Sequence, residues 1–162
     1  YDGPLARTQT FFVVSHDSAR GQIVLRGGRS AIHWPDVVDE PVYGRVDAAL
    51  GKLAKAAGAV YIKNPLSGTV LGKKPATAHP LGGCGMAADA ERGVVDDRGR
   101  VFAGSSGTEV HDGLYVTDGS VLPRSLGVNP LLSITAIAER CMLLLAETYR
   151  LEFDVAPRPG AE

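Results

Sequence analysis

The strongest constraint on the fold of this chain is a helix near its C-terminal end that starts apolar on almost every side. A helical pattern covers residues 129–149, with Asn129 expected as the N-cap and Pro130 at the first helical position. Its first two turns hold Leu131, Leu132, Ile134, Ala136, Ile137 and Ala138, relieved only by Ser133 and Thr135. A helix that is apolar all round must be surrounded. The chain has few other helices, so we expect polypeptide or cofactor outside these 162 residues to cover this start.

The bulk composition is that of an ordinary soluble protein of one-domain size. With 162 residues, 44% apolar residues and a net charge of -1, the chain shows no basic patch or acidic tail, and we expect no nucleic-acid partner. Cys84 and Cys141 are far apart and form no metal-binding or disulfide pattern, which favours a reducing, cytoplasmic compartment. No run of 18 apolar residues occurs, so we expect no transmembrane segment.

Apolar, β-branched runs in the first part of the chain predict short strands. We expect residues 10–15 and 22–26 to pair as a hairpin across the polar turn 16–21, with residues 31–34 as a candidate third strand. Residues 59–63 also have the composition of a strand.

Residues 39–57 carry apolar side chains at helical spacing and charged side chains on the other face. Pro41 lies in the first turn and Gly58 follows the end, as is typical of helix starts and stops. This pattern predicts an amphipathic surface helix.

The region before the final helix predicts a second group of strands. Residues 93–102 are expected to form a hairpin with its turn at 96–99, and residues 113–117 a buried strand. The last residues, 151–162, are expected to be a flexible tail.

Two turn motifs carry the candidate chemistry. One is His79-Pro80-Leu81-Gly82-Gly83-Cys84; the other is Leu114-Tyr115-Val116-Thr117-Asp118-Gly119-Ser120, which runs on to Gly127-Val128-Asn129-Pro130. His79 offers a proton carrier and Asn129 a neutral hydrogen-bonding amide. Taken singly, His79 is more simply a turn residue, Asn129 a helix cap, and Asp118-Gly119 a turn. His16, His33 and His111 have no metal-ligand spacing and are expected in solvent-facing turns.

Taken together, the motifs resemble the C-terminal half of the glucose-methanol-choline (GMC) family of flavin oxidoreductases, most closely its cholesterol-oxidase-like branch. The resemblance is close over residues 79–140 and includes Gly93-Val94-Val95-Asp96 and Ile134-Thr135-Ala136-Ile137-Ala138-Glu139-Arg140. It implies an α/β flavoprotein of two domains, of which this chain is an α+β segment. Residues 1–104 would then be the C-terminal part of the substrate domain, and residues 105–150 the closing strand and helix of the FAD domain.

The resemblance also implies roles for particular residues. His79 and Asn129 would face the substrate hydroxyl beside the flavin, His79 accepting the hydroxyl proton while hydride leaves the carbinol carbon, and Asn129 donating to the oxygen. FAD would be contacted by Asp118, Gly119, Asn129, Pro130 and Leu131, with the positive end of the last helix against the flavin. Family members that oxidise sugars generally carry a histidine at the position of Asn129, so a sterol-like or choline-like alcohol is expected.

The same resemblance indicates what this sequence lacks. The family holds FAD mainly with a GxGxxG turn after a strand, and the nearest copy here, Gly83-Cys84-Gly85-Met86-Ala87-Ala88, follows no apolar strand. We therefore expect an N-terminal FAD-binding half as a partner, and little activity from this segment alone. The alternative is a non-catalytic module, a truncated product or isolated domain, that binds a partner.

Overall fold

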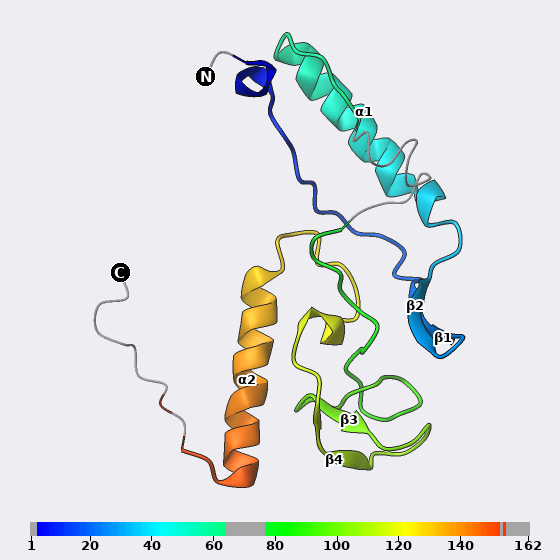
Figure 1. The fold of residues 1–162 in the computed structure, drawn as a ribbon, viewed down its shortest axis with the longest axis vertical. Helices are drawn as coiled ribbons and strands as arrows, with labels where there is room; N and C mark the ends of the chain where they lie inside the picture. The colour runs from blue at the N-terminus through cyan, green and yellow to red at the C-terminus, as the bar shows by residue number, and fades with distance from the viewer. Residues whose placement is uncertain (1–2, 64–76, 153, 155–162) are drawn as a thin grey trace.

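The structure is a computed structural model that describes residues 3–63, 77–152 and 154. Within these ranges the chain forms two α-helices, two small antiparallel sheets and short 3-10 turns (Figure 1). The expected α+β character is therefore confirmed. Most of the expected tail, and residues 64–76, lie outside the described residues.

The first sheet is a hairpin of β1 (Gln22–Arg26) and β2 (Arg29–His33), paired from Gln22↔His33 to Arg26↔Arg29. The two connecting glycines have φ angles of 57° and 77°, and positive φ at both central residues is the signature of the type I′ turn that matches strand twist. The predicted pairing of residues 10–15 with 22–26 is wrong, because residues 8–21 form no strand. The expected strand at 31–34 exists, shifted slightly, as the partner of β1.

Helix α1 (Pro41–Ala56) confirms the predicted amphipathic helix. Pro41 occupies the first turn, and Gly58 ends the helix with a φ of 66°. The amide of Gly58 bonds to the carbonyl of Lys55 at 3.2 Å, and that of Ala59 to Ala54 at 2.9 Å. These two bonds make a Schellman motif, which satisfies carbonyls that the helix end would leave bare.

The strand expected at residues 59–63 is absent from the structure. Tyr61 instead turns back to α1, where its hydroxyl donates to Asp47 at 2.8 Å. Val60 and Ile62 are 85% and 78% exposed, so the alternating pattern is present but no described strand pairs with it. A strand pattern without a neighbouring backbone cannot form a ladder.

The second sheet pairs β3 (Arg100–Phe102) with β4 (Val110–Tyr115). The expected turn at 96–99 is present, with the Gly99 amide bonded to the Asp96 carbonyl at 3.1 Å, and a single bridge joins Val95 to Val101. The hairpin predicted over 93–102 is present as a short one, since the Asp96 amide also bonds to the Arg100 carbonyl at 2.9 Å and the Phe102 amide to the Val94 carbonyl at 3.0 Å, while β3 pairs with β4 as well.

Strand β4 overlaps the predicted strand at 113–117 but is not buried. Leu114 is 49% exposed, and Gly113 takes a φ of 71° where the register between the strands shifts. The prediction of a buried strand is therefore wrong, because only the two end residues of β4, Val110 and Tyr115, are partly buried and the four between them are exposed.

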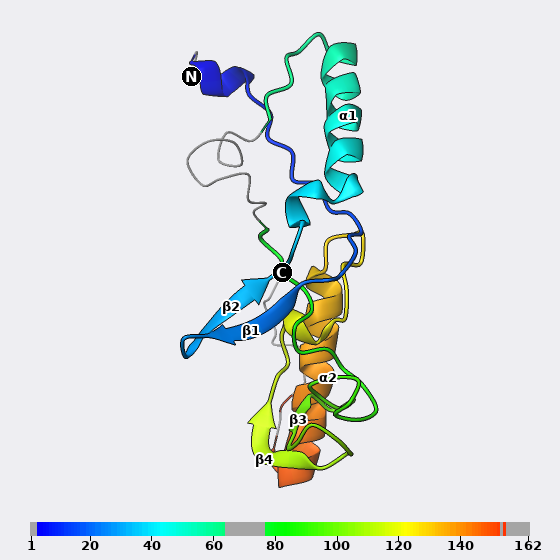
Figure 2. The ribbon, with the colours of Figure 1, turned by 90° about the vertical axis from the view of Figure 1, so that its right-hand side faces the viewer.

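Helix α2 (Leu131–Tyr149) lies beside the second sheet (Figures 1 and 2). Gly99 makes this packing close: a Cβ there would stand 3.1 Å from the sulfur of Cys141 on α2. The small core holds Val95, Phe102, Val121, Leu122, Cys141 and Ala146, all buried. Both cysteines are free thiols.

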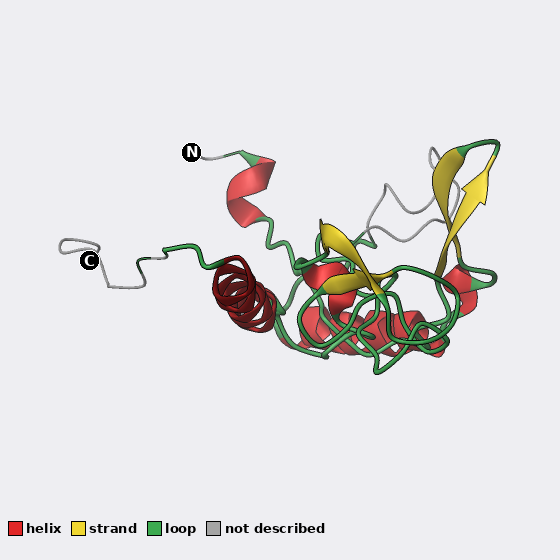
Figure 3. Cartoon of the chain, turned by 90° about the horizontal axis from the view of Figure 1, so that it is seen from below, coloured by secondary structure: helices red, strands yellow, loops and turns green. Residues whose placement is uncertain are grey.

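The molecule is open rather than compact. It exposes 12680 Å² of surface, whereas a compact monomer of 17.0 kDa exposes about 7,700 Å². The β1–β2 hairpin extends away from α2, and α1 lies at the opposite end from the second sheet (Figures 2 and 3). Within the described ranges, no helix combines the length and apolar character needed to cross a bilayer.

Candidate active site

The start of α2 presents the amide of Asn129. The helix begins at Leu131 with Pro130 as N-cap, so the predicted cap position is wrong by one residue. Asn129 nevertheless bonds the helix start, because its Oδ1 accepts the Leu131 N–H at 3.0 Å. Since an N–H can donate only to the amide oxygen, the Nδ2 group of Asn129 is left to donate elsewhere. Asn129 is exposed, while Pro130 is fully buried beneath it.

The Asp118-Gly119 turn lies next to this helix start. Asp118 caps the 3-10 turn Gly119–Val121 and accepts the Ser120 amide at 2.8 Å and the Ser120 hydroxyl. These hydrogen bonds lower the pKa of Asp118, whose exposed carboxylate is therefore ionised at neutral pH. Gly119 is buried, and a Cβ there would stand 3.0 Å from Leu81 and 3.1 Å from Ile134.

The His79 turn runs alongside the Asp118-Gly119 turn. The amide of Cys84 bonds to the Ser120 carbonyl at 3.0 Å, and the carbonyl of Pro80 is 3.4 Å from where a Gly119 Cβ would be. His79 itself is exposed, and its backbone amide bonds to the hydroxyl of Thr77 at 3.3 Å. Among the residues that the structure describes, none forms a hydrogen bond or ion pair with the His79 ring.

The structure thus brings three predicted segments together around Gly119. They are the His79 turn, the Asp118-Gly119 turn and the first turn of α2. All four of His79, Asp118, Asn129 and Leu131 are solvent-exposed. The convergence of the His79 imidazole and the Asn129 amide on one ligand, and the contacts of these segments with FAD, stay predictions.

One set of contacts near Asn129 was missed by the sequence analysis. His16 Nδ1 bonds to the Ser125 carbonyl at 3.0 Å, and the Ser125 hydroxyl donates to the Ser15 carbonyl at 2.6 Å. His16 is exposed, as expected, but it lies in this contact rather than in a free turn. The two segments are about 110 positions apart, and no local pattern links them; only the glycine at 127 marks a place where another side chain approaches.

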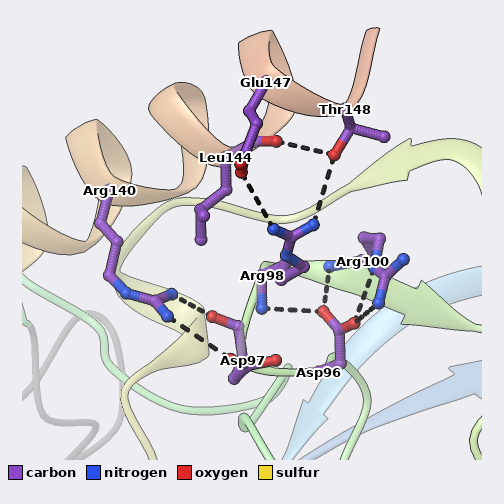
Figure 4. A network of polar contacts seen from close by, with 8 residues as sticks. All are labelled: Asp96, Asp97, Arg98, Arg100, Arg140, Leu144, Glu147 and Thr148. Atoms are coloured by element: carbon purple, nitrogen blue, oxygen red, sulfur yellow. Dashed lines mark hydrogen bonds and ion pairs between the residues drawn. The ribbon is translucent and has the colours of Figure 1, made fainter.

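A buried carboxylate fixes the turn that packs against α2. Asp96 is only 9% exposed, and its oxygens accept the Arg98 amide at 2.9 Å, the Arg100 amide at 2.9 Å and the Arg100 guanidinium at 2.7 Å (Figure 4). Burial raises the pKa of Asp96, but the hydrogen bonds from Arg100 and Arg98 outweigh burial and hold it below its ordinary value.

Two arginines join this turn to the exposed side of α2. Arg98 reaches Glu147 at 3.2 Å and the Thr148 hydroxyl at 3.4 Å, and Arg140 donates from α2 to the Asp97 carbonyl (Figure 4). These contacts join the 96–99 turn to the C-terminal half of α2.

Comparisons with known proteins agree with the motifs. Residues 47–138 match the family model described as GMC oxidoreductase. A cholesterol oxidase of Acinetobacter baumannii is 48% identical over 83 residues, 51% of this chain and 14% of that protein. One from Mycobacterium tuberculosis is 46% identical over 70 residues, 43% of this chain and 11% of the relative.

A long-chain-alcohol oxidase of Arabidopsis thaliana is 39% identical over 62 residues, 38% of this chain and 7% of the relative. The aligned segments thus span only a small fraction of these relatives' length. No solved structure matches the chain significantly.

Proposed function

This chain belongs to the GMC oxidoreductase family, and from that premise we propose that it acts as the C-terminal segment of an FAD-dependent enzyme that oxidises a CH–OH group. The observation that carries the proposal is the orientation of Asn129. Its Oδ1 is occupied by the Leu131 amide, so its Nδ2 group is available to donate to an alcohol or ketone oxygen. A neutral amide does so without adding charge.

The start of α2 fits a flavin. Leu131 and Leu132 are 64% and 82% exposed, so a large apolar surface surrounds the helix start. The first turn of a helix also leaves N–H groups without intrahelical partners, here those of Leu132 and Ser133, at the positive end of the helix dipole. Exposed apolar side chains beside free N–H groups suit a ring system with an anionic edge. When bound, FAD supplies the hydride acceptor.

His79 is the proton acceptor of the proposal. Its ring makes no hydrogen bond or ion pair with any described residue, so the ring nitrogens are open to a ligand. A neutral imidazole can accept the hydroxyl proton. Withdrawing that proton raises the electron density on the carbinol oxygen and promotes loss of hydride from the carbon.

The proposed substrate is an apolar alcohol of sterol-like shape. The names of the matched relatives, cholesterol oxidases and a long-chain-alcohol oxidase, support this class. The exposed leucines at the start of α2 support it too, since they offer apolar contact next to the polar pair. The proposal includes an N-terminal FAD-binding half as the partner that completes the site.

The test is to join this segment to its N-terminal half and record a flavin spectrum after gel filtration. We expect the joined protein to retain FAD absorbance after gel filtration. Adding a sterol or long-chain alcohol without oxygen should then reduce the flavin and bleach that absorbance. The segment alone, as the control, should retain little flavin. A joined protein that retains no flavin, or whose flavin no alcohol reduces, would contradict the proposal and favour a non-catalytic binding module.

A further inference from the structure

The imidazole of His16 occupies the side-chain space of Gly127, two residues before Asn129. A Cβ on Gly127 would stand 2.6 Å from His16 Nε2, too close for any side chain, and the φ of Gly127 is 70°. His16 Nδ1 lies 3.0 Å from the Ser125 carbonyl, which only accepts, so Nδ1 carries the proton and donates. The Ser125 hydroxyl in turn donates to the Ser15 carbonyl at 2.6 Å. The turn that leads into Asn129 is thus held by contacts from Ser15 and His16.

A second side chain from the same part of the chain fills the space where Gly83, in the His79 turn, would carry a Cβ. Ile23, on β1, places its Cδ1 2.5 Å and its Cγ1 3.1 Å from where a Gly83 Cβ would be. The φ of Gly83 is 101°, in the region that glycine alone adopts readily. Ile23 thus packs against a glycine of the His79 turn, as His16 packs against a glycine of the turn before Asn129.

The residues between these two contacts are themselves anchored. The indole of Trp34 packs on Gly21, where a Cβ would stand 2.7 Å from the ring. Glu40, only 7% exposed, accepts the Ser18 hydroxyl and pairs with Arg20 at 3.7 Å. Because these contacts restrain the middle of the segment, His16 at one end and Ile23 at the other are held at a fixed separation.

We infer that residues 16–23, here called the brace, set the spacing between the His79 turn and the Asn129 turn, with His16 and Ile23 as positioning residues for alcohol oxidation. The inference rests on the proposed function. A proton acceptor and an oxygen ligand must meet one hydroxyl group, and misplacing either by about 1 Å costs up to about 100-fold in rate. Gly83 and Gly127 lack a Cβ, so Ile23 and His16 can approach the two turns closely enough to fix the distance between the His79 turn and the Asn129 turn.

The first experiment compares two glycines in the joined, FAD-loaded protein. Gly127→Ala adds a methyl group that meets His16, whereas Gly113→Ala adds one at nearly the same φ, 71°, with nothing within 4 Å. The control thus carries the backbone strain alone. We expect Gly127→Ala to lower kcat for the alcohol about tenfold more than Gly113→Ala does. Adding His16→Ala to Gly127→Ala should lower kcat little further, because both changes remove the same contact, whereas adding Ile23→Ala should lower it further.

The second experiment separates positioning from folding. His16→Asn keeps an N–H group near the place of Nδ1, so it can still donate to Ser125, whereas His16→Ala cannot. We expect His16→Ala to lower kcat about tenfold with KM within about twofold, and His16→Asn to restore most of kcat. Thermal unfolding of each variant is recorded alongside, and the melting temperatures of His16→Ala and His16→Asn should be similar.

The inference is overturned if His16→Ala leaves kcat unchanged in a protein whose kcat falls on Asn129→Ala. It is also overturned if Gly127→Ala is no worse than Gly113→Ala, or if His16→Asn loses as much kcat as His16→Ala. If Asn129→Ala and His79→Gln both leave turnover intact, the proposed function itself is contradicted. The positioning role of residues 16–23 is then contradicted as well, and the Asn129 and His79 variants distinguish this outcome from a failure of the positioning role alone.

Discussion

At the scale of single residues, His79 and Asn129 differ in how well the sequence predicts them. Asn129 follows from local chemistry, because an amide before Pro130 at a helix start has few other uses, and its bond to Leu131 is present. His79 follows only from its resemblance to a family motif, since a histidine in an exposed turn has no local signature. His16 follows from neither, because its contact to Ser125 depends on segments far apart in the chain.

The role of His79 predicts a loss of turnover without a loss of fold. In the joined protein His79→Gln should lower kcat at least about 100-fold, the scale of a lost general base. His111→Gln is the matched control, since His111 is an exposed histidine on β4 away from the site. Steady-state alcohol oxidation and thermal unfolding of both variants make the comparison, and equal turnover in the two would remove His79 from the mechanism.

Asp96 predicts a pH dependence of stability. Its hydrogen bonds to Arg100 and Arg98 hold its folded pKa below the ordinary value, despite burial, so the unfolded state binds more protons in acid. Its contribution is therefore complete above the unfolded pKa of about 3.9 and is lost as pH falls through the lower folded value.

Asp96→Asn should lower the free energy of unfolding by about 1.5–3 kcal/mol at neutral pH and flatten its fall below about pH 4. Asp97→Asn, at a neighbouring carboxylate that is 76% exposed, should change it by less than about 1 kcal/mol. Urea unfolding of the joined protein at a series of pH values measures both. An unchanged acid slope in Asp96→Asn would contradict the account.

At the scale of elements, local signals predict helices better than strands. The amphipathic pattern, Pro41 and Gly58 fix α1 without help from the rest of the chain. The apolar runs predict the wrong partner for β1, because the two-residue Gly27-Gly28 turn, whose backbone twist suits a hairpin, closes the β1–β2 pair instead of the polar six-residue loop before it. Residues 59–63 have a strand pattern but no strand, since pairing depends on a backbone elsewhere.

The end of α1 gives a paired test of glycine conformation. Gly58→Ala should lower the free energy of unfolding by about 1 kcal/mol, because Gly58 has a φ of 66° in the Schellman motif. Gly51→Ala, inside α1 with open space around it, should raise it by about 0.5–1 kcal/mol. Chemical denaturation of the joined protein distinguishes the two, and a stabilising Gly58→Ala would contradict the assigned helix end.

At the scale of the whole molecule, large apolar side chains remain exposed on three surfaces. Phe12 is 88% exposed in the extended N-terminal segment, Leu25 79% on the first hairpin, and Leu132 82% at the start of α2. The all-round apolar pattern predicted a covered helix start, and among the described residues this start is open. The cover expected over the helix start therefore stays a prediction, since Leu131 and Leu132 have no local pattern that shows what packs on them. The division at residue 104 and the FAD-binding partner stay predictions too.

The most direct test of the central claim is a crystal structure of the joined protein with FAD and a ketone product bound. We predict that the His79 ring and the Asn129 Nδ2 both lie within about 3.2 Å of the ketone oxygen, with the start of α2 against the flavin. The two side chains pointing into separate pockets, or a flavin bound away from the start of α2, would contradict it.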